Sequence, residues 1–176
     1  MIPHDQTSTP IRYVIVPCAL GRLLVAATER GVCAVSLADN DAELVDFLHG
    51  EFPEREMTYA ADSLHEWAGA VVQLLEGQHP RREVPIDVQA TAFQKRVWQE
   101  LCRIPSGDTR SYREIAAALG QPDAARAVAR ACATNPIAVI VPCHRVIRAD
   151  GGLSGYRWGV QRKQAILDRE KAQASS

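Results

Sequence analysis

The sequence lacks the features that would place it in a membrane or direct its export. No apolar run reaches the roughly 18 residues that a membrane-spanning helix requires. The first ten residues are polar and contain no apolar core of a secretion signal. No internal repeat or low-complexity block is present, and 47% of the residues are apolar, which is ordinary for a globular protein. These absences predict a cytoplasmic globular protein with no membrane partner.

Cysteine motifs for metal binding or redox chemistry are also missing. No two cysteines have the C-x-x-C spacing of a zinc knuckle or a thiol–disulfide motif, so the sequence predicts no metal site. The number of cysteines is odd and their spacings are wide, which favours free thiols in a reducing compartment. Most of these side chains are expected to be small buried apolar groups. The cysteines are Cys18, Cys33, Cys102, Cys132 and Cys143.

Charge is unevenly divided although the net charge is only −1. Residues 1–88 contain six Lys/Arg and fourteen Asp/Glu, whereas residues 89–176 contain fourteen Lys/Arg and seven Asp/Glu, so the two halves carry −8 and +7. A basic half on an otherwise acidic chain is typical of proteins that bind a polyanion such as DNA. Two oppositely charged surfaces that dock on each other would give the same pattern, and charge alone leaves both interpretations open.

The first half is predicted to be a small α/β unit of the α+β kind, with an antiparallel sheet. β-branched residues separated by short turns indicate a meander of strands, and apolar residues at helical spacing indicate two helices. The strands are expected over residues 11–18, 21–28 and 31–37, and the helices over 41–52 and 62–76. Asp39 or Asn40 would cap the first of these helices.

The second half is predicted to be mostly helical. Residues 78–90 contain Pro80 and Pro85 without a helical period, and they are expected to link a domain at 11–88 to a domain at 89–173. Capping boxes at 91–94 and 111–114 each begin a helix. The second box leads into helices at 112–119 and 124–133 joined by a Gly-containing turn, a pattern that predicts a helix-turn-helix.

The second helix of this pair is rich in alanine and carries Arg126 and Arg130 on one face. Small side chains let a backbone approach another surface closely. Two arginines suit phosphate contact and a narrow groove better than the reading of bases in the major groove. An alanine-rich core helix with two solvated arginines is the alternative.

A candidate nucleophile follows an apolar stretch at residues 137–141, which is predicted to be a strand. It leads into Cys143, and His144 and Arg145 place positive charge beside the thiol. Nearby cations lower the pKa of a thiol, and the thiolate is the nucleophile. Neighbouring residues of a strand point to opposite faces, so Cys143 and His144 can touch only if the chain turns or a water bridges them. A buried structural cysteine beside an incidental histidine is the alternative.

The tail of the sequence favours a ligand pocket. Residues 151–159 form a Gly-rich stretch with two aromatic residues and an arginine, and a helix is expected from 160 to about 171. Glycines let backbone donors approach a ligand closely, and aromatic side chains can border a pocket for a flat base.

At Pro142-Cys143-His144-Arg145-Val146 the sequence resembles the O6-alkylguanine-DNA alkyltransferases, the methylated-DNA–protein-cysteine methyltransferases. The resemblance extends through blocks at 111–112, 125–128, 135–136 and 154–159, and it covers about residues 11–171. Within the family it is greatest to the catalytic half of a bacterial adaptive-response protein, whose zinc-binding four-cysteine half has no counterpart here. The family implies a ribonuclease-H-like N-terminal domain and a helix-turn-helix that enters the minor groove.

The resemblance implies a catalytic set. Cys143 matches the alkyl acceptor, His144 the histidine that activates it through a water, and Glu170 the acid that orients this histidine. Asn135 matches the asparagine that braces the active-site turn. Tyr112 matches the tyrosine beside the flipped base, where its hydroxyl can protonate the leaving purine.

The resemblance also implies residues that contact DNA and the base. Arg126 matches the arginine finger that fills the gap left in the duplex. The neighbouring residues expected to contact DNA are Ser111, Ala125, Ala127 and Arg130. The residues expected to border the substrate pocket are Tyr112, Val146, Ser154, Tyr156 and Arg157.

The implied function is irreversible, single-turnover transfer of the alkyl group of O6-alkylguanine, and of O4-alkylthymine, from double-stranded DNA to Cys143. The resemblance implies a monomer and no cofactor. A non-enzymatic helix-turn-helix DNA-binding protein is the alternative, and in that case Cys143→Ala would leave function intact. A Cys–His hydrolase is a third hypothesis, but it leaves the basic pair of helices unexplained.

Overall fold

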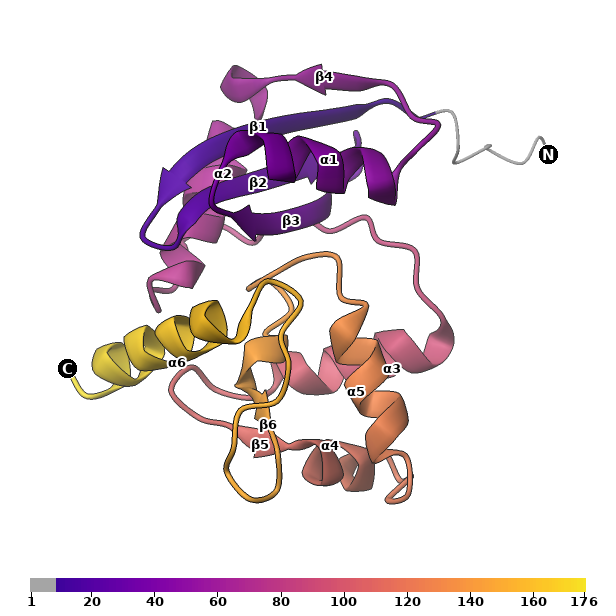
Figure 1. The fold of residues 1–176 in the computed structure, drawn as a ribbon, viewed down its shortest axis with the longest axis vertical. Coiled ribbons are helices and arrows are strands. Elements are labelled where there is room, and N and C mark those ends of the chain that lie inside the picture. Colours follow the sequence, from indigo (N-terminus) through magenta and orange to yellow (C-terminus); the bar gives the residue numbers. More distant parts are fainter. Residues whose placement is uncertain (1–8) are drawn as a thin grey trace.

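The structure, a computed structural model, describes residues 9–176. It places a sheet with two helices next to a mostly helical half, and an extended segment connects the two (Figure 1). This arrangement confirms the predicted α+β fold class. The N-terminal segment that we predict to carry no secretion signal lies, for residues 1–8, outside the described part of the chain.

The sheet of the first half is mixed rather than antiparallel. The predicted meander is confirmed, because β1 (Ile11–Cys18) pairs antiparallel with β2 (Gly21–Ala27), and β2 pairs antiparallel with β3 (Val32–Ala38). Sequence reasoning missed β4 (Met57–Tyr59), which pairs parallel with β1 and gives the order β3-β2-β1-β4. β4 was missed because a strand of three residues is too short to show an alternating pattern. Since it pairs parallel with β1, the expectation of an antiparallel sheet was wrong.

The two helices of the first half pack against opposite faces of this sheet. α1 (Asp41–Glu51) begins at Asn40, whose side chain accepts a hydrogen bond from the backbone N–H of Glu43 at 3.0 Å. α2 (Ala61–Leu75) has a continuous apolar stripe. Successive strand residues point to opposite faces, so the sheet supplies two cores. The smaller one contains Ile11, Ile15, Leu24, Leu44 and Leu48.

The larger core continues from the first half into the second. It joins the α2 side of the sheet to residues from every helix of the C-terminal half, as well as to the segment that carries Cys143. Examples from the two halves are Val25, Leu64, Trp98, Ile115 and Ile166. The halves are therefore packed through buried apolar contacts, which are the main favourable term in folding.

The linker covers the outer edge of β3. The backbone N–H of Val32 donates to Pro85 O at 2.8 Å, and the N–H of Asp87 donates to Val32 O at 2.8 Å. Further along the same edge, Val35 forms an isolated bridge with Ile137. An edge strand with unpaired backbone groups can pair with other chains, and here the linker and Ile137 occupy that edge.

The helices of the second half begin where the sequence predicts. α3 (Ala92–Cys102) and α4 (Tyr112–Ala118) each have a complete capping box, at Thr91 and Ser111. α5 (Ala125–Ala133) follows α4 after a turn, and α6 (Val160–Ala174) extends three residues beyond the expected end. No helix within residues 9–176 is long and apolar enough to cross a membrane.

The apolar stretch before Cys143 is not the predicted strand. Ile137 makes one bridge to β3, after which the chain turns, and Val139 has a positive φ of 60°. A short 3-10 helix (Cys143–Arg145) then leads into β6 (Val146–Ile147), which pairs parallel with β5 (Arg110–Ser111). Hydrogen bonds with the buried Asn135 side chain override the local preference of this segment for extended structure.

We predict that Gly31→Ala destabilises the fold. The new Cβ would lie 2.6 Å from Pro85 O and 2.9 Å from Ile86 N, backbone atoms that cannot move without disturbing the bridge to β3. The expected loss in unfolding free energy is about 1–3 kcal/mol, measured by urea denaturation. Gly50→Ala in α1, where a new Cβ meets nothing within 4 Å, is the control and should be neutral or stabilising by up to about 1 kcal/mol. Equal losses in the two variants would contradict the close approach at Gly31.

Candidate active site

Cys143 lies at the start of a tight backbone turn between the two halves. Its N–H donates to Val141 O at 2.8 Å, and the 3-10 helix begins at this residue. The residue is only 4% exposed. The turn satisfies the geometric condition set by the sequence, because consecutive residues in a 3-10 helix do not point to opposite faces as they do in a strand.

The side chain of Asn135 holds the Cys143 turn through hydrogen bonds. Its Nδ2 donates to Val141 O at 3.1 Å and to Cys143 Sγ at 3.2 Å, while its Oδ1 accepts from the N–H of Ile137 at 3.0 Å. Asn135 is fully buried and comes directly after Thr134, the C-cap of α5. One amide side chain thus ties the end of α5 to both the backbone and the sulfur of the turn.

A buried carboxylate organises His144 and Arg145. Glu170 Oε1 lies 2.7 Å from His144 Nε2, and Arg145 donates from Nε and Nη2 to the two carboxylate oxygens at 2.9 and 2.7 Å. Burial opposes the charge on Glu170, but the hydrogen bonds from His144 and Arg145 prevail and lower its pKa to about 2. The carboxylate is therefore ionised at neutral pH and can only accept, so Nε2 of His144 carries a proton.

His144 is a neutral imidazole with one nitrogen available. Burial lowers its pKa, although the Glu170 hydrogen bond and charge oppose this effect. With the proton on Nε2, the lone pair resides on Nδ1, which is buried and has no hydrogen-bond partner within residues 9–176. A buried nitrogen without a hydrogen-bond partner destabilises the folded state, so its presence points to a functional role. Nδ1 is therefore the natural acceptor for a proton.

The electrostatics of the thiol differ from the expectation drawn from sequence. Burial raises the pKa of Cys143, and the opposing effects come from the Asn135 hydrogen bond and from Lys163 and Arg157. The predicted cations do not serve this purpose, because His144 is neutral and Arg145 is directed to Glu170 and to Ile104 O. The resting thiol is thus protonated, and a reaction at sulfur requires a base.

Lys163 is a site residue that sequence reasoning missed. It is fully buried on α6, and its Nζ donates to Val146 O at 2.6 Å and to Ser154 Oγ at 3.1 Å. Burial lowers its pKa, while the nearby Cys143 raises it. The sequence did contain a signal for its burial, since Lys163, Ile166 and Glu170 lie on one face of the helix. A lysine at such a position is usually solvent-exposed, so it was not predicted.

Three of the residues predicted to border the pocket, Tyr112, Val146 and Ser154, are linked by hydrogen bonds through Lys163. The hydroxyl of Tyr112, at the start of α4, forms a short hydrogen bond with Ser154 Oγ, which also accepts from Lys163. Val146 is buried and supplies the carbonyl that holds Lys163. We call residues 151–159 the substrate-pocket loop, after the pocket that the sequence predicts there. The structure therefore brings its Ser154 together with Tyr112 and Val146.

The end of the substrate-pocket loop contacts both halves. Tyr156 has a buried hydroxyl without a hydrogen-bond partner among the described residues, and its ring packs edge-on against Trp158 at 5.1 Å. Arg157 Nη1 donates to Asn135 O at 3.2 Å, and Arg157 also pairs with Glu51 of α1. Arg157 and Asn135, both predicted from the sequence as site residues, are therefore in direct contact.

The residues predicted to contact DNA lie on a separate surface of α4 and α5. Arg126 and Arg130 are exposed and form no ion pair within the described chain, whereas Val128 and Cys132 of the same helix are buried. Ala125 and Ala127 are partly buried beside them, and Ser111 caps α4. No hydrogen bond within residues 9–176 joins this surface to Cys143; the connection is through the end of α5 at Asn135.

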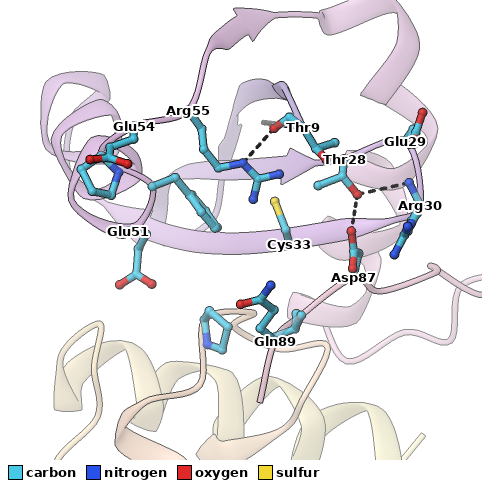
Figure 2. Close-up of a pocket in the computed structure, with 14 residues that line it drawn as sticks. Thr9, Thr28, Glu29, Arg30, Cys33, Glu51, Glu54, Arg55, Asp87 and Gln89 are labelled. Carbon is cyan, nitrogen blue, oxygen red and sulfur yellow. Dashed lines mark hydrogen bonds between the residues drawn. The ribbon is translucent and has the colours of Figure 1, made fainter. Parts of the chain in front are cut away.

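A cavity of about 420 Å³ lies elsewhere, between the loop after α1, the linker and Pro136. Figure 2 shows Cys33 and Arg55 near its centre and the hydrogen-bonded pair Thr28–Asp87 on one wall. Cys143 does not line it. Burial raises the pKa of Cys33 to about 12, so this thiol is not a reactive one.

The fold and the site together define a class of protein: a two-part chain that holds one buried cysteine beside a neutral histidine and next to an exposed pair of short helices. Two family models match it. The ribonuclease-like domain of 6-O-methylguanine DNA methyltransferase matches residues 11–88, and the DNA binding domain of the same family matches residues 92–172. The chain belongs to the methylated-DNA–protein-cysteine methyltransferase family.

Individual relatives agree with this assignment. The inducible methylated-DNA–protein-cysteine methyltransferase of Bacillus subtilis is 39% identical, with 86% of this chain and 85% of that protein covered. The bifunctional transcriptional activator/DNA repair enzyme Ada of Escherichia coli is 47% identical over 95% of this chain. The chain spans about half the length of Ada, 47%. A crystal structure of Mycobacterium tuberculosis OGT in complex with DNA has a TM-score of 0.77 and 35% identity, covering 92% of this chain and 94% of that one.

We predict that Glu170→Gln costs stability in a pH-dependent way. The folded-state pKa of Glu170, about 2, lies below its ordinary 4.5, so its contribution is present above about pH 4.5 and is lost as the pH falls toward 2. At pH 7 the variant should lose about 3 kcal/mol of unfolding free energy.

Urea denaturation at pH 7, 5 and 3 tests this, and the difference between wild type and variant should shrink at the lowest pH. Asp168→Asn, an exposed acid on the same helix, is the control and should change little at any pH. A loss at Glu170 that stays constant with pH would contradict the role of the ionised carboxylate.

Proposed function

We propose that this chain repairs DNA by moving the alkyl group of O6-alkylguanine, and of O4-alkylthymine, onto Cys143. The observation that carries the proposal is the neutral His144, oriented by Glu170, in the turn that holds a buried cysteine. The thiolate attacks the alkyl carbon, an S–C bond forms, and the C–O bond breaks with its electron pair leaving on the purine oxygen. The products are a thioether and an unmodified base.

The thiol proton goes to His144 in this mechanism. The pKa of Cys143 is raised by burial, so a base is needed, and Nδ1 of His144 has the free lone pair to accept the proton through a water. The imidazolium that forms is stabilised by Glu170, whose charge is already fixed by Arg145. Asn135 holds the sulfur at 3.2 Å and stabilises its negative charge.

The departing purine receives its proton from Tyr112. The Tyr112 hydroxyl is bonded to Ser154, and Ser154 accepts from the buried ammonium of Lys163. Burial raises the pKa of the Tyr112 hydroxyl, although the hydrogen bond with Ser154 opposes this effect. The hydroxyl therefore keeps its proton at rest and gives it up as negative charge develops on the base. The substrate-pocket loop, with Val146, Tyr156 and Arg157, forms the walls of the site for the extrahelical base.

DNA binds to the α4–α5 surface in this proposal. The surface belongs to the basic half of the chain, and Arg126 and Arg130 project from α5 with the small residues Ala125 and Ala127 on either side of Arg126. We propose that these helices form a helix-turn-helix that enters the minor groove, with Ser111 contacting the backbone. Arg126 then fills the space that the flipped base leaves, which offsets part of the cost of unstacking.

The reaction balances without a cofactor or metal, because the thiolate supplies the electron pair and the alkyl carbon is the electrophile. A thioether has no good leaving group, so each molecule acts once. A free thiol requires a reducing compartment, which supports a cytoplasmic location. We further propose that the protein acts as a monomer, with domains at 11–88 and 89–173.

Transfer to Cys143 predicts a mass increase of one methyl group after incubation with an oligonucleotide that contains O6-methylguanine. Intact-mass spectrometry and peptide mapping should place the group on Cys143. Cys143→Ser should abolish the increase while leaving duplex binding within about twofold, because phosphate contacts dominate affinity. Cys33→Ser is the matched control and should react as wild type. An unchanged wild-type mass, or a methyl group on another thiol, would refute the proposal.

A finger role for Arg126 predicts substrate-dependent loss. Arg126→Ala should slow transfer from duplex DNA by about tenfold or more, the scale of a single lost charged contact, and should leave reaction with free O6-benzylguanine nearly unchanged. Arg82→Ala, an exposed arginine of the linker, is the control for charge. An equal loss on both substrates in single-turnover assays would rule out the finger.

A further inference from the structure

We propose that Glu51, the last residue of α1, is a positioning residue for alkyl transfer. It holds Arg157 and thereby fixes the substrate-pocket loop beside Cys143. The inference rests on the proposed function and extends it, because it gives the first half of the chain a part in binding the base.

Arg157 is the point where this contact is made. One Nη of Arg157 forms a short ion pair with Glu51 Oε1, and the other donates to Asn135 O at 3.2 Å. The guanidinium also stacks over the ring of Phe47, 5.0 Å from its centroid. The two charged side chains are 24% and 29% exposed, so solvent screens the pair less than it would a fully exposed one.

The substrate-pocket loop depends on such contacts from outside. It contains Gly151 and Gly159 with positive φ values of 84° and 98°, and glycine leaves a backbone free to adopt other conformations. Its middle is attached to the second half through Ser154, and its end to the first half through Trp158, whose Nε1 donates to the buried Ser36 Oγ at 3.0 Å. The Glu51–Arg157 pair lies between these two attachments.

The placement of Glu51 shows that its carboxylate is committed to this contact. Glu51 lies on the rim of the 420 Å³ cavity, and its side chain points toward the C-terminal half while Glu54 points elsewhere (Figure 2). Arg157 in turn contacts the carbonyl of Asn135, the residue that holds the Cys143 sulfur. Glu51 of α1 is therefore connected to the Cys143 turn through Arg157 and Asn135.

Saturation kinetics with free O6-benzylguanine test the proposal, because this base meets the pocket without a duplex. For Glu51→Gln the half-saturating concentration should rise roughly two- to fivefold, the scale of one partly exposed ion pair. The limiting rate should change by less than about twofold, because His144 and Asn135 are intact. Glu51→Asp, which keeps the charge, should recover part of the loss. Glu54→Gln removes the same charge three residues away and should behave as wild type.

A double-mutant cycle separates positioning from a general loss of structure. In an Arg157→Gln background, Glu51→Gln should have no further effect on the half-saturating concentration. Additive effects, an equal change in Glu54→Gln, or a loss confined to the limiting rate would overturn the role of Glu51. The wild-type intact mass is measured alongside: no alkylation of wild type refutes the proposed function, whereas normal alkylation with an unaffected Glu51→Gln refutes this inference alone.

Discussion

Burial of the Cys143 thiol is the constraint on which the site depends. Removing the sulfur from water raises the pKa of the thiol, so the nucleophile cannot exist as a standing thiolate without help. The surrounding residues answer this in two ways. Asn135 and Lys163 favour negative charge on sulfur, and His144 is neutral, so in the proposed mechanism it can take the proton. A buried, protonated thiol is also less susceptible to oxidation than a thiolate.

Glu170 converts this constraint into a stable structure. Burying a carboxylate alone would be very costly, but here its oxygens accept from Arg145 and His144. The same carboxylate fixes the tautomer of the histidine, so one buried group both stabilises the fold and leaves Nδ1 free for the proton transfer that we propose. Arg145, expected to act on the thiol, instead joins α6 to the carbonyl of Ile104.

Local signals in the sequence predicted most of the secondary structure. The capping residues Thr91 and Ser111 start α3 and α4 as expected, and the β-branched residues of β1 to β3 form the predicted meander. The turn before Cys143 could not be predicted, because it is imposed by the side chain of Asn135 on an apolar segment that would otherwise be extended. The contact between Glu51 and Arg157 joins residues 106 positions apart and leaves no local pattern.

The covered edge of β3 has a consequence for how the two halves depend on each other. Val32 is hydrogen-bonded to the linker, and Val35 forms a bridge with Ile137, which begins the segment that ends at Cys143. The sheet thus provides backbone partners for the segment that leads to Cys143. An isolated C-terminal fragment would lose these backbone partners and expose one side of the shared core. A chimera that joins the N-terminal half of one relative to the C-terminal half of another must therefore keep the residues that form these contacts, even if each half is unchanged internally.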